Sequence, residues 1–159
     1  MSQAPSPLET SHGYSPPSVT QFSVFLTNKV GKLFDLVEAF DGRCQICALS
    51  VHEASDHAVV RIVTNAASTA RELLRHEGLP FSERDVLVVE LCRGKLLSQL
   101  CLCLLSAELS IHFAYPLMHQ RGGEATIALA VDDLTLAGQI LRRKEFRLLG
   151  EADLPGISG

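Results

Sequence analysis

The sequence lacks a hydrophobic segment long enough to cross a membrane. A spanning helix needs about 20 consecutive apolar residues, and no run in this chain reaches that length. The first residues also lack the basic and then apolar pattern of a secretory signal peptide. These two absences predict a cytoplasmic protein that has no membrane partner.

The sequence also lacks a concentration of positive charge. Its 14 lysines and arginines are outnumbered by 18 aspartates and glutamates, which gives a formal net charge of −4. Proteins that bind nucleic acids gather Lys and Arg into a patch that neutralises phosphates. The one basic segment, Leu141 to Arg147, is better explained as the last turn of a helix, where cations interact favourably with the helix dipole. We therefore expect no nucleic-acid partner.

Motifs for catalysis and for cofactors are missing as well. The sequence contains no nucleophile elbow, no P-loop, no HExxH zinc motif and no dinucleotide-binding fingerprint. Its histidines and carboxylates are scattered over expected turns and helix surfaces. We therefore predict that the protein is not an enzyme and needs no cofactor.

Disulfide bonds are not expected either, because the five cysteines are an odd number and the predicted compartment is reducing. Cys44 and Cys47 form a C-x-x-C motif. Zinc and redox versions of this motif place the first cysteine at a helix start or a tight knuckle. Here the motif enters an expected strand, where residues three apart point to opposite faces unless Cys44 lies in the preceding loop. A small metal or redox carrier is the least favoured interpretation.

What the chain does contain is enough apolar sequence for a sizeable core. Hydrophobic residues make up 47% of it and charged residues 20%, a composition typical of a globular protein. Its length suits one ordinary domain or two small ones. Residues 1–18 hold four of the seven prolines and almost no apolar periodicity, which predicts a flexible tail.

From Val19 onward the apolar pattern predicts the element order β-α-β-β-α-β, and it predicts that order twice. The first unit has a strand from Val19, a helix with apolar residues at 30, 33, 34, 37 and 40 that stops at Asp41-Gly42, strands at 44–51 and 57–63, and a helix at 67–77 with Ala70, Leu73 and Leu74 inward. The second has a helix at 95–108, strands at 110–115 and 124–131 around a polar turn at 120–123, a helix at 134–144 and a short strand at 146–150. Only one long strand, about 84–92, lies between them, so it serves both units or is divided between them.

This order predicts an α+β fold of two ferredoxin-like units in tandem, each an antiparallel sheet with two helices on one face. We place the units at 19–88 and 86–154, with a C-terminal tail at 155–159. Each unit is too small to be stable alone, so we expect their sheets to join edge to edge. The helix at 95–108 is apolar nearly all round, which predicts burial on more than one side and favours a homodimer.

One local motif occurs in both units. The segment NKVGKLFDL, Asn28 to Leu36, reappears as LCRGKLLSQL, Leu91 to Leu100. A strand that ends in Asn and is followed by KVGKL at the start of a helix, in tandem ferredoxin-like units, resembles the ACT domain over about residues 19–154. The chain is most similar to short stand-alone proteins made of two ACT domains. This resemblance implies a regulatory protein that binds a small amino acid at an interface between two units, between the strand-to-helix corner of one and a strand of its neighbour.

Such a corner has the physical properties that an amino-acid ligand requires. The first N–H groups of a helix lack partners and have a partial positive charge, which suits a carboxylate. Gly31 allows a close approach or a positive φ, and Asn28 offers a donor and an acceptor, although the two residues could equally form only a tight turn and a helix cap. The candidate ligand-binding residues at the two corners and on nearby strands are Asn28, Lys29, Val30, Gly31, Lys32, Leu33, Ser50, His52, Arg93, Gly94 and His112.

The second corner departs from the pattern of the first. Leu91 takes the place of Asn28, and Cys92-Arg93 replace Lys29-Val30. Arg93 could clamp a carboxylate or remain a solvated charge, so the sequence leaves open whether this corner binds a ligand. The leading hypothesis is a regulatory homodimer that binds an amino acid and acts on a partner enzyme or regulator in trans. The alternative is a structural or protein-interaction module without a ligand.

Overall fold

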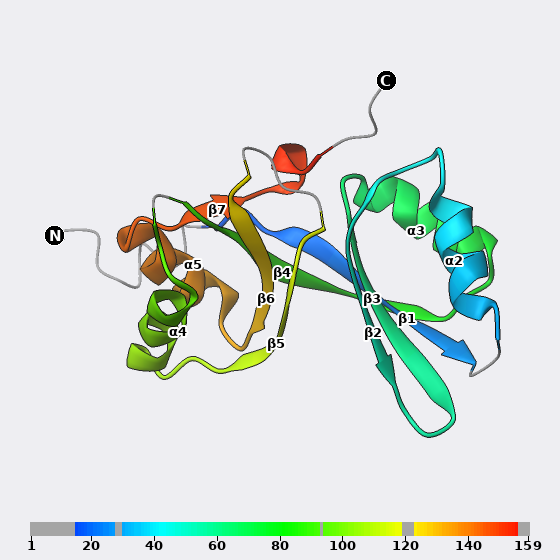
Figure 1. The fold of residues 1–159 in the computed structure, drawn as a ribbon, viewed down its shortest axis with the longest axis horizontal. Helices are drawn as coiled ribbons and strands as arrows, with labels where there is room; N and C mark the ends of the chain where they lie inside the picture. The colour runs from blue at the N-terminus through cyan, green and yellow to red at the C-terminus, as the bar shows by residue number, and fades with distance from the viewer. Residues whose placement is uncertain (1–14, 28–29, 93, 119–122, 156–159) are drawn as a thin grey trace, which may run out of the picture.

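The computed structural model describes residues 15–27, 30–92, 94–118 and 123–155. Figure 1 shows their arrangement: two helices lie at each end of the molecule, and the strands lie between them as two half-sheets that face each other. No helix in the described part of the chain is long and apolar enough to span a membrane. The helices thus lie at the two ends of the molecule, and the strands lie between them.

The first unit follows the predicted element order. Its elements are β1 (Val19–Thr27), α2 (Lys32–Phe40), β2 (Ile46–Glu53), β3 (His57–Thr64), α3 (Ala67–His76) and β4 (Phe81–Leu91). The strands pair antiparallel in the order β2-β3-β1-β4. The predicted ferredoxin-like arrangement is confirmed for this unit.

The second unit repeats the arrangement. It reuses β4 and continues with α4 (Leu97–Ser106), β5 (Ile111–Pro116), β6 (Ala125–Val131), α5 (Leu134–Arg143), β7 (Arg147–Leu149) and a short 3-10 turn (Glu151–Asp153). The order across its strands is β7-β4-β6-β5, again antiparallel. Residues 119–122 of the predicted polar turn lie outside the described ranges.

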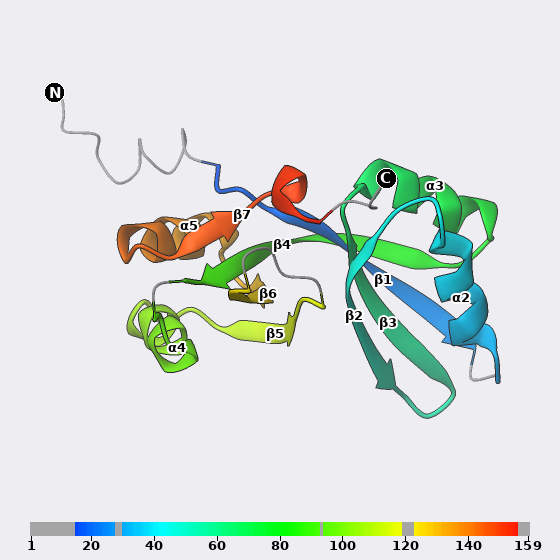
Figure 2. The ribbon, with the colours of Figure 1, turned by 45° about the horizontal axis from the view of Figure 1, so that its top comes forward.

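Strand β4 belongs to both units, as the sequence predicts, and it begins three residues earlier than predicted. Its first half, Phe81 to Val86, pairs with β1. Its second half, Leu87 to Leu91, pairs with β6, and Val88 to Glu90 also pair with β7. The two sheets are therefore one continuous sheet of seven strands (Figure 2).

The alternating side chains of β4 enter three different cores. Phe81 packs beneath the helices of the first unit, and Leu87 and Val89 pack beneath those of the second. Val86 and Val88 point the other way, into a third core between the two half-sheets. The sequence predicts only edge-to-edge joining, but the sheet also curls, so that the faces without helices pack against each other. We call this third core the inter-unit core.

Helix α2 buries only part of the apolar side that was predicted. The predicted stripe includes residues 30, 33 and 34, but Val30 is fully exposed and Phe34 is 66% exposed. The buried residues are Leu36 and Phe40, one turn apart, and of these Phe40 belongs to the predicted stripe whereas Leu36 does not. Because successive residues are about 100° apart around a helix, burial of Leu36 turns Phe34 to the opposite side. An apolar surface is therefore left uncovered on α2.

Helix α4 is also less buried than predicted. Only Leu100 and Leu104 are buried, against the sheet, while Leu97, Leu102 and Leu105 are exposed. The prediction that α4 is buried on more than one side is wrong for the single chain, because the first unit lies on the far side of the sheet (Figure 1). Helix α3 buries Ala70, Leu73 and Leu74 as predicted.

Candidate functional site

The first strand-to-helix corner is open. Gly31 has φ +88°, the left-handed conformation that glycine adopts without strain, and a Cβ placed on it would meet no atom within 4 Å. Helix α2 starts at the next residue, and no side chain described in the structure caps it. Val30 and Lys32 are exposed there, and Leu33 is at the limit of exposure. Asn28 and Lys29 lie outside the described residues.

The second corner has the same glycine geometry but a different helix start. Gly94 has φ +74°, yet α4 begins only at Leu97, and the Leu96 N–H donates to Oε1 of Gln99 at 2.8 Å. One of the unpaired donors expected at this helix start is therefore already satisfied. Arg93 lies outside the described residues. The sequence already shows that the second corner departs from the first, and the structure adds a later and capped helix start.

A hollow of about 570 Å³ lies beside the second corner. Its walls include the aromatic ring of Phe146 and charged side chains of both signs, and the full set is Glu90, Cys92, Lys95, Glu145, Phe146 and Arg147. Glu90 is 5% exposed, and its Oε1 accepts a hydrogen bond from the Arg147 guanidinium at 3.1 Å. A hollow that offers both a carboxylate and cations has the electrostatics that a zwitterion requires.

The residues predicted from the sequence do not include Glu90 and Arg147, which line this candidate site. They meet because β4 and β7 pair in a register that sets Glu90 opposite Arg147. The only local signal is a glutamate in the apolar half of β4. A register across strands more than 50 residues apart is not visible in a single sequence.

The two corners lie at opposite ends of the molecule. The end of β1 lies beside the start of β4, where the Phe25 N–H donates to the Pro80 carbonyl at 3.0 Å. The second corner follows the other end of β4, ten residues away. At about 3.3 Å per residue, that separation is roughly 33 Å. One ligand cannot contact both corners of the same chain.

The strand candidates do not gather at one place. His52 pairs with Val59, which pairs with Phe25, so His52 lies at the same sheet end as the first corner but two strands away. Ser50 is further along β2, opposite Arg61. His112 lies next to the β5–β6 pairing at Val131, at the opposite end of the second sheet from Gly94. Among the residues that the structure describes, the strand candidates and the corner candidates therefore form no common site.

Side chains fill the space between the two half-sheets of one chain. The buried Tyr115 hydroxyl donates to Oε1 of Gln21 at 2.6 Å, and the Arg61 guanidinium lies 4.1 Å from the centroid of the Phe113 ring. Burial raises the pKa of Tyr115 well above its usual value, although the nearby Arg61 opposes this shift. These contacts occupy space between the two units of one chain.

The two cysteines of the C-x-x-C motif belong to different cores. Cys44 lies in the loop before β2 and packs beneath α2 and α3, whereas Cys47 belongs to the inter-unit core. Burial raises the pKa of Cys44, and burial together with the neighbouring Cys44 raises the pKa of Cys47 to about 11. Thiolates are the reactive and metal-binding form, so this environment disfavours both uses. The described residues contain no group of three or more metal-binding side chains.

A family model described as "ACT domain pair" matches residues 17–157. No curated protein sequence matches. Among solved structures, protein BT0572 from Bacteroides thetaiotaomicron is similar with a TM-score of 0.77 and 20% identity, covering 87% of this chain and 96% of that one.

Two further structures share the fold at lower similarity. The regulatory subunit of aspartate kinase from Thermus thermophilus, in its ligand-free form, has a TM-score of 0.56 and 11% identity, with 82% of this chain and 93% of that one covered. The same subunit from Thermus flavus has a TM-score of 0.52 and 13% identity, with 81% and 93% covered. At these identities the likeness concerns the fold alone.

Proposed function

The chain belongs to the family of ACT domain pairs, and from this premise we propose that it is a non-catalytic regulatory module that binds a small amino acid. The effect of binding passes to a separate enzyme or regulator in trans. Two structures with the same fold are named as regulatory subunits of aspartate kinase, which supports a regulatory role. Binding can act as a switch only as far as the ligand prefers one arrangement of the units over another.

The hollow beside the second corner is the observation that supports this proposal best. Its buried Glu90 carboxylate suits the α-amino group of a ligand, and the cations of Lys95 and Arg147 suit the α-carboxylate. The first corner is the other candidate, because the start of α2 is uncapped and open around Gly31. In a homodimer formed beside α4 the second chain would adjoin the second corner, which agrees with the interface binding that the family resemblance implies.

A thermal-shift screen of the full chain against the twenty amino acids tests the proposal. A ligand at 100 times its dissociation constant stabilises the fold by about 2.7 kcal/mol, so a binding amino acid raises the melting temperature by several degrees. The absence of a shift with all twenty at millimolar concentration would refute amino-acid binding.

Two variants then locate the site. Glu90→Gln removes the shift if the ligand occupies the hollow at the second corner, and Glu77→Gln, the same change at an exposed residue outside the hollow, is the matched control. Gly31→Val removes it if the ligand occupies the first corner. A Cβ at Gly31 meets no atom within 4 Å, but the positive φ strains any other residue there by about 1–2 kcal/mol or more, so circular dichroism checks that the variant folds.

A second candidate function is a protein-interaction module without a ligand. The exposed apolar residues of α2 and α4, such as Phe34 and Leu105, favour it, because contiguous apolar surface marks interaction sites. The amino-acid screen separates the two candidates: an interaction module shows no shift, whereas the proposed amino-acid sensor does.

A further inference from the structure

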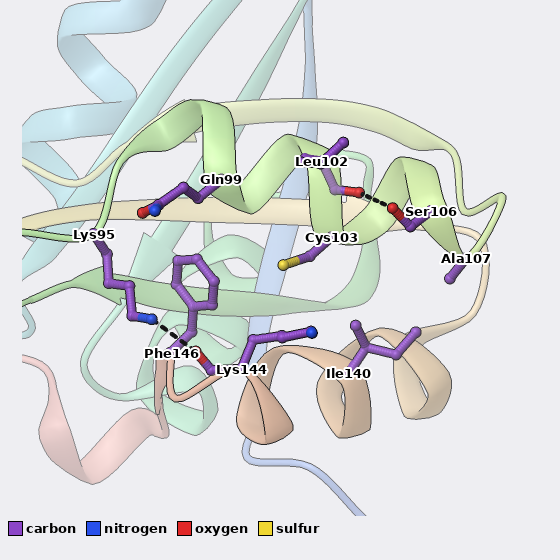
Figure 3. Close-up of a pocket in the computed structure, with 9 residues that line it drawn as sticks. All are labelled: Lys95, Gln99, Leu102, Cys103, Ser106, Ala107, Ile140, Lys144 and Phe146. Atoms are coloured by element: carbon purple, nitrogen blue, oxygen red, sulfur yellow. Dashed lines mark hydrogen bonds between the residues drawn. The ribbon is translucent and has the colours of Figure 1, made fainter.

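The two helices of the second unit leave a cavity between their outer sides. Its volume is about 470 Å³. Figure 3 shows the side chains of Cys103 on α4 and Ile140 on α5 pointing into it from opposite sides. The ring of Phe146, which follows α5 and is itself buried, forms part of the wall. Two elements of one unit therefore build this cavity, separately from the corner at Gly31.

Most of the cavity wall is apolar. Its apolar residues are Leu102, Cys103, Ala107, Ile140 and Phe146. The Ser106 hydroxyl donates to the Leu102 carbonyl at 2.8 Å, so its proton is already used. An apolar wall of this kind selects a ligand with an apolar body, because burying apolar surface is favourable and burying an unpaired polar group is costly.

The charged groups of the cavity are two ammonium groups, those of Lys95 and Lys144. No carboxylate lines the cavity, and within the described ranges neither ammonium forms an ion pair. Nζ of Lys95 donates to the Lys144 carbonyl at 2.9 Å and lies 5.2 Å from the centroid of the Phe146 ring. Lys95 thereby offsets the negative end of the α5 dipole, which leaves the Lys144 ammonium for an anionic ligand.

From this combination of wall and charge we propose that the cavity between α4 and α5 binds a small aliphatic carboxylate. Its volume lies within the range of about 300–1,000 Å³ that is typical of small-molecule sites. The tail would lie against Ile140 and Cys103, and the carboxylate would pair with Lys144. This site is additional to the proposed amino-acid site: Lys95 and Phe146 line both, but Ile140 and Lys144 line only this cavity.

The same charges disfavour a second copy of the chain as the occupant. In a two-fold dimer the same surface meets itself, so the Lys95 and Lys144 ammonium groups of both chains would face each other across this groove. Like charges brought together in this way repel. A small anion removes that repulsion, whereas a second copy doubles it.

Calorimetric titration of the full chain with hexanoate, octanoate and octylammonium tests the proposal. Octanoate should bind about 16-fold more tightly than hexanoate, since each buried methylene contributes about fourfold in affinity, and octylammonium should not bind. Equal binding of octanoate and octylammonium would overturn the proposal, because it would show that the ammonium groups have no part.

Variants assign the binding to this cavity. Lys144→Glu should weaken octanoate at least tenfold, while Arg143→Glu, an identical charge change on the neighbouring exposed residue outside the cavity, should leave it within twofold. Ile140→Trp should abolish octanoate binding, because the larger side chain fills the cavity. Circular dichroism checks that this variant folds. The site would be refuted if Lys144→Glu and Arg143→Glu weakened octanoate binding equally. It would also be refuted if the affinity for octanoate changed with the fraction of dimer. Glu90 does not line this cavity, so Glu90→Gln should leave octanoate binding unchanged. Failure of the proposed amino-acid site and failure of the carboxylate site can therefore be told apart.

Discussion

At the scale of single residues, the hydrogen bond between Tyr115 and Gln21 is the most informative contact. It joins the two units inside the inter-unit core, and both residues are buried. The amide nitrogen of Gln21 donates in turn to the Ser23 hydroxyl at 3.1 Å. A buried polar group without its partner is costly, so this bond specifies how the half-sheets align.

Tyr115→Phe should destabilise the chain by about 1–3 kcal/mol, because it leaves the Gln21 oxygen buried without a donor. Urea unfolding of the variant measures the effect. The double variant Tyr115→Phe with Gln21→Leu should recover part of the loss, since neither polar group then remains. Additive losses in the double-mutant cycle would show that the bond does not couple the two units.

The residue scale also shows what a single sequence can predict about the candidate site. Gly31 has the positive φ that the sequence offers as one of two roles for it, and Gly94 in the repeated motif has it too, because a positive φ is a local property. Tyr115 and Gln21 lie 94 positions apart, and neither is exceptional within its own strand. Glu90 and Arg147 are missed for the same reason, because only the register of β4 against β7 brings them together.

At the scale of elements, helix α4 has an outer stripe that the single chain leaves uncovered. Leu97, Cys101 and Leu105 lie at successive i, i+4 positions, and all three are exposed. Residues four apart share one face of a helix. This stripe is distinct from the side of α4 that lines the cavity, and it is the surface on which we expect the proposed homodimer to form.

Leu105→Glu should convert the dimer to a monomer without lowering the melting temperature of the monomeric fold, because Leu105 is 70% exposed in the single chain and its burial comes only from the partner. Sedimentation or light scattering gives the mass. Phe34→Glu on α2 is the matched control and should leave the dimer intact. A dimeric Leu105→Glu protein, or loss of the dimer in Phe34→Glu, would move the interface elsewhere.

The helices illustrate a second limit of prediction from sequence. The existence of α2, α4 and α5 follows from their apolar periodicity, and the prediction holds for each. Which side of a helix is buried is harder to predict for α2 and α4, because both are apolar on more than one side. Leu36 and Leu100 are the buried residues only because the sheet lies on their side of the helix. Helix α3, with charges on its outer side, is predicted correctly in both respects.

At the scale of the whole molecule, the units are not independent. Val19, Val63 and Val86 of the first unit are buried only because the second unit covers that face of the sheet. The carboxylate of Glu151, near the end of the second unit, also accepts a hydrogen bond from the N–H of Ala67 at the start of α3. Each unit therefore supplies part of the structure of the other.

A chain ended after Leu91 should not fold. It retains every element of the first unit, but it exposes one full face of the sheet, and units of this size have little stability to lose. Circular dichroism and amide exchange measure the outcome, and the full chain should unfold in a single transition. A folded fragment, or two separate transitions in the full chain, would contradict this interdependence.

Strand β4 also sets which sequence changes the gene can tolerate. Substitution of Val86 or Leu87 by another apolar residue alters packing at one place. Deletion of Val86 would turn every later side chain of the strand to the opposite face, sending Leu87 and Val89 towards the inter-unit core and Val88 towards the helices of the second unit. The number of residues in this segment is therefore under stronger constraint than their identity, and an in-frame loss of one codon should be more damaging there than any conservative missense change.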